Sequence, residues 1–225
     1  MEVKLVGVTQ PSAITGCNTA NELIAYAARV SNPSNQNNEK TAPKLLRYLI
    51  KEGHWSPFEM VSVTMEIKTT RDISRQILRH RSFSFQEFSQ RYAVSEGFVT
   101  NREARTQHST NRQLSLSFGD DEVQRSKQQT FTELQQRVLG VAKDSYEMAL
   151  NQGIAKEQAR ALLPEGLTET TVYMSGTLRS WVHYCQLRRI EGTQKEHMDV
   201  ADMCWDILGV HFPDVIKAVD GMSDD

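Results

Sequence analysis

Residues 61–81 have the sequence VSVTMEIKTTRDISRQILRHR, in which the spacing of apolar residues changes midway. Up to Lys68, apolar and polar residues alternate one by one, which is the period of a strand with one buried face. From Thr70 to about Arg81 the period becomes helical, because Ile73 and Ile77 lie on one helix face. The segment therefore predicts a strand that leads directly into a helix.

Patterns on either side of this segment predict the remaining elements. Strands are predicted near residues 3–8 and 168–174. Helices are predicted after the capping-box sequence Thr19–Glu22, around residues 45–50, from about 121 to 152, just before Pro164, and from about residues 178 and 198. Residues 31–38, 54–57 and 100–120 lack a clear period and predict loops.

No internal repeat and no linker rich in Pro or Gly divides the chain. We therefore predict one α+β domain over residues 1–220, with a small antiparallel or mixed sheet packed against several helices, one of them long. Residues 221–225 are expected to form a disordered tail.

Composition restricts the class of protein. The 225 residues are 39% hydrophobic and 24% charged, and no apolar run approaches the roughly 18 residues of a membrane span. The three cysteines are far apart and form no Cys-x-x-Cys pair, which excludes a disulfide framework and a cysteine-rich zinc site. The N-terminus lacks the pattern of a secretory signal. We expect a globular protein of the reducing cytoplasm, without a membrane partner.

Basic residues are concentrated between Lys68 and Arg91, a segment that contains six basic and two acidic residues. A solvated helix face is the favoured interpretation for Arg71 and Arg75. The run from residue 79 to 81 differs, because it lies where the helical period ends and is followed by hydroxyls, an amide, a carboxylate and Arg91. Such a set can bind phosphate and a polar heterocycle, so it predicts a ligand site.

Two alternatives accompany this prediction. We interpret Phe83, Phe85 and Phe88 as core residues. Because they lie among basic residues, they would also suit a module that binds single-stranded nucleic acid. A net charge of −2 counts against nucleic acid as a partner. The remaining histidines without metal-ligand spacing are interpreted as ordinary surface or hydrogen-bonded residues, and no metal site is predicted. They are His108, His197 and His211.

The motif Arg79-His80-Arg81, followed after seven residues by Ser89, resembles the signature of flavin-dependent thymidylate synthases. The resemblance extends to Gln76, three residues before the motif, and covers roughly residues 20–210. Further segments match that family in order, namely residues 53–59 (GHWSPFE), 159–164 (ARALLP), 178–183 (LRSWVH), 187–189 (LRR) and 194–196 (QKE).

This resemblance implies conversion of dUMP to dTMP, with methylenetetrahydrofolate as carbon donor and NADPH as reductant through bound FAD. The implied FAD-binding residues are His54, Ser56, Arg79, His80, Arg81, Glu87, Thr177, Arg179 and His183. The implied dUMP-binding residues are Gln76, Arg79, Glu87, Ser89, Gln90, Arg91, Arg160 and Arg188. Arg188 is the implied catalytic residue, which would stabilise an anionic uracil ring.

The resemblance also implies a homotetramer whose active sites are shared between subunits. No protein nucleophile is expected, since none of the cysteines lies in a basic motif that would favour its thiolate. Ser89 is interpreted as a ligand-binding hydroxyl rather than a nucleophile.

Overall fold

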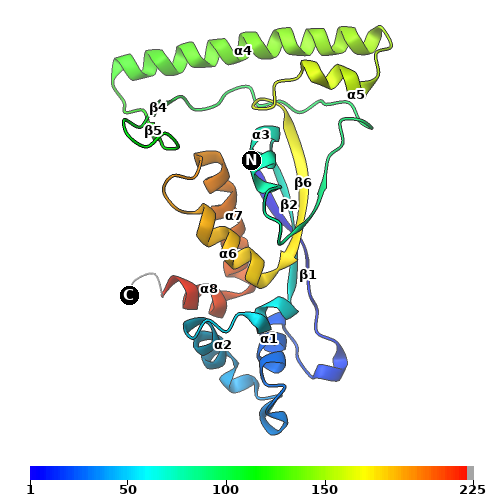
Figure 1. The fold of residues 1–225 in the computed structure, drawn as a ribbon, viewed down its shortest axis with the longest axis vertical. Helices are drawn as coiled ribbons and strands as arrows, with labels where there is room; N and C mark the ends of the chain where they lie inside the picture. Colours follow the sequence, from blue (N-terminus) through cyan, green and yellow to red (C-terminus); the bar gives the residue numbers. More distant parts are fainter. Residues whose placement is uncertain (222–225) are drawn as a thin grey trace.

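The computed structural model describes residues 1–221 of the chain. The molecule is elongated: a long helix lies across one end, a small sheet with covering helices occupies the middle, and a group of shorter helices forms the other end (Figure 1).

A four-stranded sheet forms the middle of the molecule. Its strands are β1 (Glu2–Val8), β2 (Ser62–Thr70), β6 (Glu169–Thr177) and β3 (Ser84–Glu87), in the order β1-β2-β6-β3. Every neighbouring pair is antiparallel, and Met65 of β2 is paired with Leu5 of β1 and Met174 of β6. The alternation in β2 places Val63, Met65 and Ile67 in the core. The structure thus confirms the α+β prediction, with an antiparallel sheet.

Helices α6 (Leu178–Arg188) and α7 (Lys195–His211) pack together on this core, and α3 (Arg71–Ile77) follows β2 directly. Trp181, Tyr184 and Cys185 of α6 are completely buried. The indole N–H of Trp181 donates a hydrogen bond to the main-chain oxygen of Val63, 3.0 Å away. This bond attaches α6 to the central strand.

The end opposite the long helix is formed by α1 (Ala20–Ala28), α2 (Ala42–Lys51) and α8 (Pro213–Asp220) (Figure 1). The predicted capping box is present, because the Thr19 side chain accepts from the Glu22 N–H and the Glu22 carboxylate accepts from the Thr19 N–H. Short 3-10 helices complete the connections at Ala13–Thr15, Pro33–Asn35, Glu39–Thr41, Ser56–Met60 and Arg160–Leu162.

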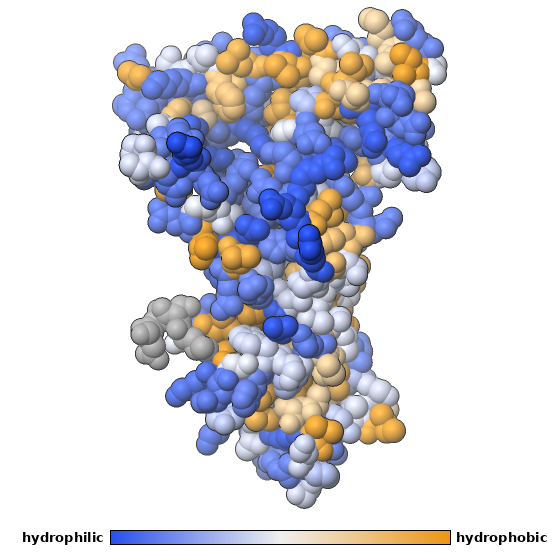
Figure 2. Space-filling view, in the orientation of Figure 1, coloured by the Kyte–Doolittle hydropathy of each residue, from blue (hydrophilic) through white to orange (hydrophobic). Residues whose placement is uncertain are grey.

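The long helix α4 (Glu122–Asn151) begins after Asp121, whose side chain caps it by accepting from the Gln124 N–H. It ends before Gly153, which has a left-handed φ of 79°, and α5 (Lys156–Ala159) follows. Apolar side chains are exposed along α4 and form an interrupted band at this end of the molecule (Figure 2). They are Val123, Phe131, Leu134, Val138, Val141 and Met148.

Several sequence-based expectations were wrong. The segment 100–120 is not only a loop, because β4 (Arg105–Gln107) and β5 (Ser115–Ser117) form a hairpin in it. Strands of three residues are too short to show a period. The helix after β2 ends at Ile77, four residues before Arg81.

The interpretation of Arg71 was also wrong, whereas that of Arg75 was right. Arg71 is 7% exposed and lies 3.6 Å from the Glu87 carboxylate, while Arg75 pairs with Glu165 on the surface. Of the three phenylalanines, Phe83 is buried and half-buried Phe85 packs against the core, as predicted, whereas Phe88 is exposed. Within the expected tail, Gly221 follows α8, and residues 222–225 lie outside the described part of the chain.

Across residues 1–221, no helix combines the length and the apolar composition needed to cross a membrane.

Gly176 of β6 leaves room for the Phe83 ring, which a Cβ at this position would overlap. We predict that Gly176→Ala lowers the free energy of unfolding by about 1–3 kcal/mol through overpacking. Gly209→Ala in α7 is the control, because a Cβ there has no neighbour within 4 Å. The control should raise stability by about 0.5–1 kcal/mol through its helix propensity. Urea unfolding measures both, and equal stability of the two variants would contradict the packing argument.

Candidate functional site

Helix α6 presents polar residues on two sides of its buried face. It begins at Thr177, whose hydroxyl accepts from the Ser180 N–H at 3.2 Å. Arg179 and His183 are one helical turn apart and exposed, whereas Arg188 at the last turn is half-buried. One helix thus supplies both an open pocket and an enclosed polar cluster.

The open pocket has a cavity of about 190 Å³ beside the first two turns of α6. Its lining combines an indole ring, hydroxyls, an imidazole and a guanidinium, from Trp55, Ser82, Arg179, Ser180, Val182, His183 and Gln186. The guanidinium of Arg179 donates to Glu59 at 2.8 Å in a half-exposed ion pair. Such exposed pairs are weak, so Arg179 can exchange this partner for an anionic ligand.

Arg188 and His80 are in direct contact. The Nε of Arg188 lies 2.9 Å from the Nε2 of His80 and donates to it, because a guanidinium can only donate. His80 is therefore neutral in this contact. Burial and, after it, the positive charges of Arg188, His183 and Arg79 together lower the pKa of His80 to about 4. The ring of Tyr184 packs edge-on against that of His80.

A completely buried histidine extends this cluster. His197 of α7 has no exposed surface, and its two ring nitrogens lie 3.1 Å from the Tyr184 hydroxyl and 3.3 Å from the Gln76 amide oxygen. Burial, followed by the charges of Arg188 and His80, lowers the pKa of His197 to about 3. The enclosed polar cluster is thus formed by His80, Arg188, Tyr184, His197 and Gln76.

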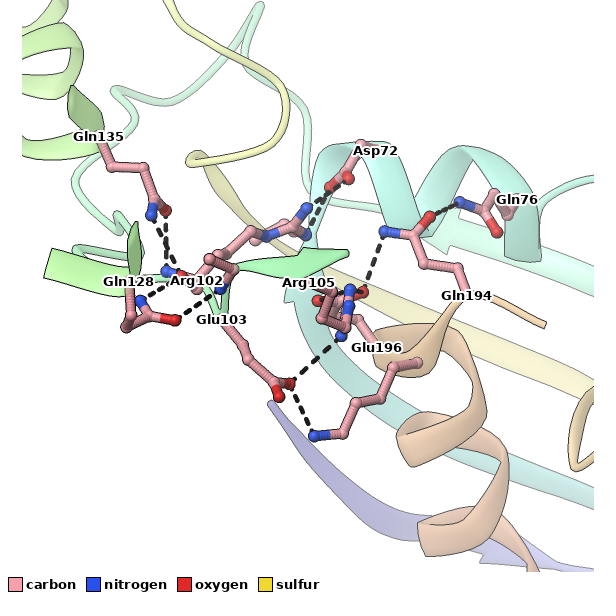
Figure 3. A network of polar contacts seen from close by, with 12 residues as sticks. Asp72, Gln76, Arg102, Glu103, Arg105, Gln128, Gln135, Gln194 and Glu196 are labelled. Carbon is pink, nitrogen blue, oxygen red and sulfur yellow. Dashed lines mark hydrogen bonds and ion pairs between the residues drawn. The ribbon is translucent and has the colours of Figure 1, made fainter. Parts of the chain in front are cut away.

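A polar network continues from Gln76 to the β4–β5 hairpin (Figure 3). Gln76 donates to Gln194 at 2.7 Å, and Gln194 donates to the Glu196 carboxylate at 3.0 Å. Arg105 of β4 binds both oxygens of Glu196 at 2.6 and 2.8 Å. Arg102 similarly forms a bidentate ion pair with Asp72 of α3. The hairpin segment is therefore attached to the two helices that carry the cluster.

Glu87 of β3 is held by neighbours on the sheet and on α3. One carboxylate oxygen accepts from the hydroxyls of Ser74 and Thr170 at 2.8 and 3.1 Å, and Arg71 lies 3.6 Å away. The other carboxylate oxygen makes no hydrogen bond with the described residues. Glu87 is thus fixed in place with an acceptor left over.

A separate basic group is formed by Arg91, in the segment after β3, and Arg160, directly after α5. Arg91 pairs with Glu157 at 3.2 Å, and the Arg160 guanidinium donates to the main-chain oxygen of Glu157. Gln90 is buried and donates to Ser95. Within residues 1–221, no hydrogen bond or ion pair joins Arg91 or Arg160 to Arg188.

The predicted site residues therefore fall into distinct groups. Gln76, His80 and Arg188 lie in the enclosed cluster, whereas Arg179 and His183 line the pocket. The basic group contains Arg91 and Arg160, and the residues directly before Arg91 are Ser89 and Gln90. Thr177 caps α6. Arg79 and Arg81 are exposed and make no side-chain hydrogen bond with the described residues; His54 is exposed beside Tyr48, and Ser56 begins a 3-10 helix.

Tyr184 and His197 were not predicted as site residues. His197 does satisfy the interpretation of a hydrogen-bonded histidine, and a signal for its burial exists. It precedes Val200, Ala201 and Cys204 at helical spacing, so it shares their buried face.

The cysteines lie outside these contacts. Cys185 and Cys204 are completely buried, and burial raises the pKa of both thiols well above the usual value. Cys17 is half-buried near the N-terminus. Neither buried thiol is set up to form a thiolate.

Comparison with known proteins gives a family match over most of the chain. Residues 14–214 match the family described as thymidylate synthase complementing protein. A probable flavin-dependent thymidylate synthase of Paramecium bursaria Chlorella virus 1 is 50% identical over 220 residues, covering 98% of this chain and 99% of the viral protein. A flavin-dependent thymidylate synthase of Synechocystis sp. is 47% identical over 222 residues, covering 98% of this chain and 100% of that protein.

The fold also matches a solved structure. The UMP/dUMP methylase PolB from Streptomyces cacaoi, bound with 5-Br dUMP, superposes with a TM-score of 0.81 at 25% sequence identity. The match covers 98% of this chain and 94% of PolB.

Half-buried His80 and buried His197 make folding sensitive to pH. Their folded pKa values of about 4 and about 3 lie below the value of about 6.5 for an unfolded histidine. Between those values the unfolded chain binds more protons, so the free energy of unfolding should fall as the pH decreases from about 6.5 toward 4. Urea unfolding at about pH 7, 6 and 5 measures this dependence.

His80→Gln should make that dependence shallower, because it removes one of the two groups that must stay neutral. His211→Gln, which removes an exposed histidine at the end of α7, is the control and should keep the wild-type slope. A wild-type stability that does not change over this pH range would contradict the neutral state of both histidines.

Proposed function

The chain belongs to the thymidylate synthase complementing protein family, and on that premise we infer that it is a flavin-dependent thymidylate synthase. It converts dUMP to dTMP, taking the carbon from methylenetetrahydrofolate and reducing equivalents from NADPH through FAD. The observation that carries this conclusion is 50% identity over nearly the whole chain to a relative of that name. The resemblance predicted from the motifs around Arg79 and Ser89 is thereby confirmed.

The open pocket fits part of a flavin dinucleotide. Trp55 provides a flat apolar surface, Arg179 a donor for pyrophosphate, and His183 a further polar ring. Exposed Arg81 adds a second cation on the segment that carries Ser82. We assign FAD binding to this pocket together with the other residues implied by the motif: His54, Ser56, Arg79, His80, Glu87 and Thr177. When bound, FAD supplies the redox chemistry, and the protein supplies position and field.

The basic group suits the phosphate of dUMP. Arg91 and Arg160 carry two guanidinium groups, and the Arg91–Glu157 pair is half-exposed. A phosphate carries up to two negative charges, so it can replace the exposed Glu157 carboxylate as the partner of these guanidinium groups. We therefore assign the phosphate to Arg91, Arg160 and Ser89, with Gln90 as a buried support for this segment.

Arg188 is placed to act on the pyrimidine ring. Its Nε is bound to His80, so the terminal guanidinium N–H groups are left to bind a ligand. A guanidinium keeps its charge at every working pH and can stabilise negative charge that develops on the uracil ring, which makes C5 more nucleophilic. The role of His80 is to accept from Arg188 in its neutral form and to fix the plane of the guanidinium. Gln76, Arg79 and Glu87 complete the dUMP contacts in this assignment.

A protein thiol has no part in this mechanism. Buried Cys185 and Cys204 have pKa values raised by burial, so at neutral pH both stay protonated and poorly nucleophilic. Activation of the pyrimidine is left to the guanidinium and to the reduced cofactor.

We further propose that the protein is a homotetramer in which subunits share each active site. Three observations support this assembly. The cavity of about 190 Å³ is smaller than the roughly 300–1,000 Å³ of ordinary ligand sites. Within residues 1–221, no hydrogen bond or ion pair joins the basic group of Arg91 and Arg160 to the enclosed cluster that contains Arg188. The apolar side chains exposed along α4 offer a surface for a second subunit.

The activity is tested on the purified protein. We expect FAD to copurify, giving a yellow protein, and dUMP to accelerate NADPH oxidation. With methylenetetrahydrofolate present, dTMP should form, as measured by chromatography. Arg188→Ala should lower dTMP formation by about 10- to 150-fold, since a lost charge-assisted contact costs about 1.5–3 kcal/mol, while FAD stays bound. A colourless protein that cannot be reconstituted with FAD would contradict the assignment.

Shared sites predict that two inactive variants rescue each other. Ser89→Ala and Arg188→Ala chains, dissociated and reassembled together, should form some sites that contain both native residues. Random mixing gives about a quarter of the wild-type activity when the two residues of one site come from different chains. Each variant reassembled alone is the control. If verified mixed oligomers remain inactive, both residues act within one chain.

A further inference from the structure

His197 lies deeper than any residue that the motifs place in the site. It has no exposed surface, belongs to the first turn of α7, and connects Tyr184 of α6 to Gln76 of α3. Both of its ring nitrogens are used in these two contacts. The direction of each hydrogen bond decides which nitrogen carries the proton.

That direction can be worked out from the far end of the network. Glu196 is clamped by Arg105 at 2.6 and 2.8 Å. Burial alone would raise the pKa of Glu196, but hydrogen bonds from its backbone N–H, Arg105 and Gln194 outweigh burial and lower it. Glu196 is therefore a carboxylate, which only accepts hydrogen bonds.

Each partner in turn is then restricted to one orientation. Gln194 must present its NH₂ to Glu196, so its oxygen faces Gln76. Gln76 must present its NH₂ to that oxygen (Figure 3), so its own oxygen faces Nδ1 of His197. Since an amide oxygen only accepts, Nδ1 of His197 carries the proton. Nε2 is then the acceptor of the Tyr184 hydroxyl.

We propose that His197, held as the neutral Nδ1–H tautomer, is a positioning residue that fixes the amide of Gln76 for binding of the dUMP pyrimidine nucleotide. Gln76 keeps one N–H and one carbonyl lone pair beyond its bonds to Gln194 and His197. Without His197 the Gln76 carbonyl loses its partner, and the amide is held in place only by its bond to Gln194. The identity of the ligand rests on the proposed function, whereas the tautomer does not.

The tautomer is tested without any ligand. Protein labelled with ¹⁵N at its six histidines gives two-bond ¹H–¹⁵N correlations that distinguish the Nδ1–H and Nε2–H forms. The signal that disappears in His197→Gln identifies the residue, and the signal shifted by Tyr184→Phe provides a second identification should the first variant fold poorly. We expect the Nδ1–H pattern at neutral pH. An Nε2–H tautomer or an imidazolium would overturn the proposal.

The positioning role is tested with paired substitutions. Asn reproduces the Nδ1 donor and Gln reproduces the Nε2 acceptor, so His197→Asn keeps the bond to Gln76 and His197→Gln loses it. We expect His197→Gln to raise the KM for dUMP about 5- to 15-fold, the loss of one net hydrogen bond, with kcat and FAD affinity within about twofold. His197→Asn should restore the KM to within about threefold, and His211→Gln should match the wild type.

Each outcome has one meaning. If the two His197 variants lose dUMP binding, FAD binding and thermal stability in parallel, the residue is merely structural and the proposal fails. It also fails if the KM for dUMP stays unchanged in His197→Gln. If the wild-type protein itself does not bind dUMP, the proposed function fails, while the tautomer measurement still stands by itself.

Discussion

The attachment of α6 to the sheet is the constraint on which the rest of the site depends. Trp181 is completely buried, and its indole N–H finds its acceptor on β2 at the main-chain oxygen of Val63. An unpaired buried N–H is costly, so this bond fixes both the depth and the rotation of the helix. Once that rotation is set, Arg179 and His183 are directed to the pocket and Arg188 reaches His80.

Electrostatics then determines the state of the groups around Arg188. Burial and, after it, the permanent positive charge of half-buried Arg188 disfavour a second positive charge nearby, so His80 and His197 stay neutral. Both can therefore act as hydrogen-bond acceptors, which an imidazolium cannot. The β4–β5 hairpin contributes at a distance, because Arg105 holds the carboxylate that sets the orientation of the amides leading to His197.

Local patterns predicted the central parts of the fold and the motif residues. The alternation in residues 61–68 identified β2, the spacing of Thr19 and Glu22 identified the start of α1, and a resemblance identified the family. Helical periodicity, however, states only which residues share a face and not which face is buried. Arg71 was misplaced for that reason: its partner Glu87 belongs to β3, a strand too short to show a period.

Contacts between residues far apart in the sequence could not be predicted from local patterns. Arg105 and Glu196 are 91 positions apart, and Gln76 and His197 are 121 apart, so no spacing rule links them. The division of the predicted site into an enclosed cluster, a pocket and a basic group likewise depends on how α4, α5 and α6 are arranged. These features require the three-dimensional structure.

The burial of two cysteines has a consequence for the response of the protein to electrophiles. Alkylating reagents and peroxides attack the thiolate form, which Cys185 and Cys204 do not offer inside the core. Cys17 is the accessible thiol among residues 1–221, and it lies in the segment before α1, outside the contacts of the enclosed cluster. Alkylation or oxidation of Cys17 would therefore leave the contacts of the enclosed cluster intact, whereas the same modification of a catalytic thiolate destroys the site.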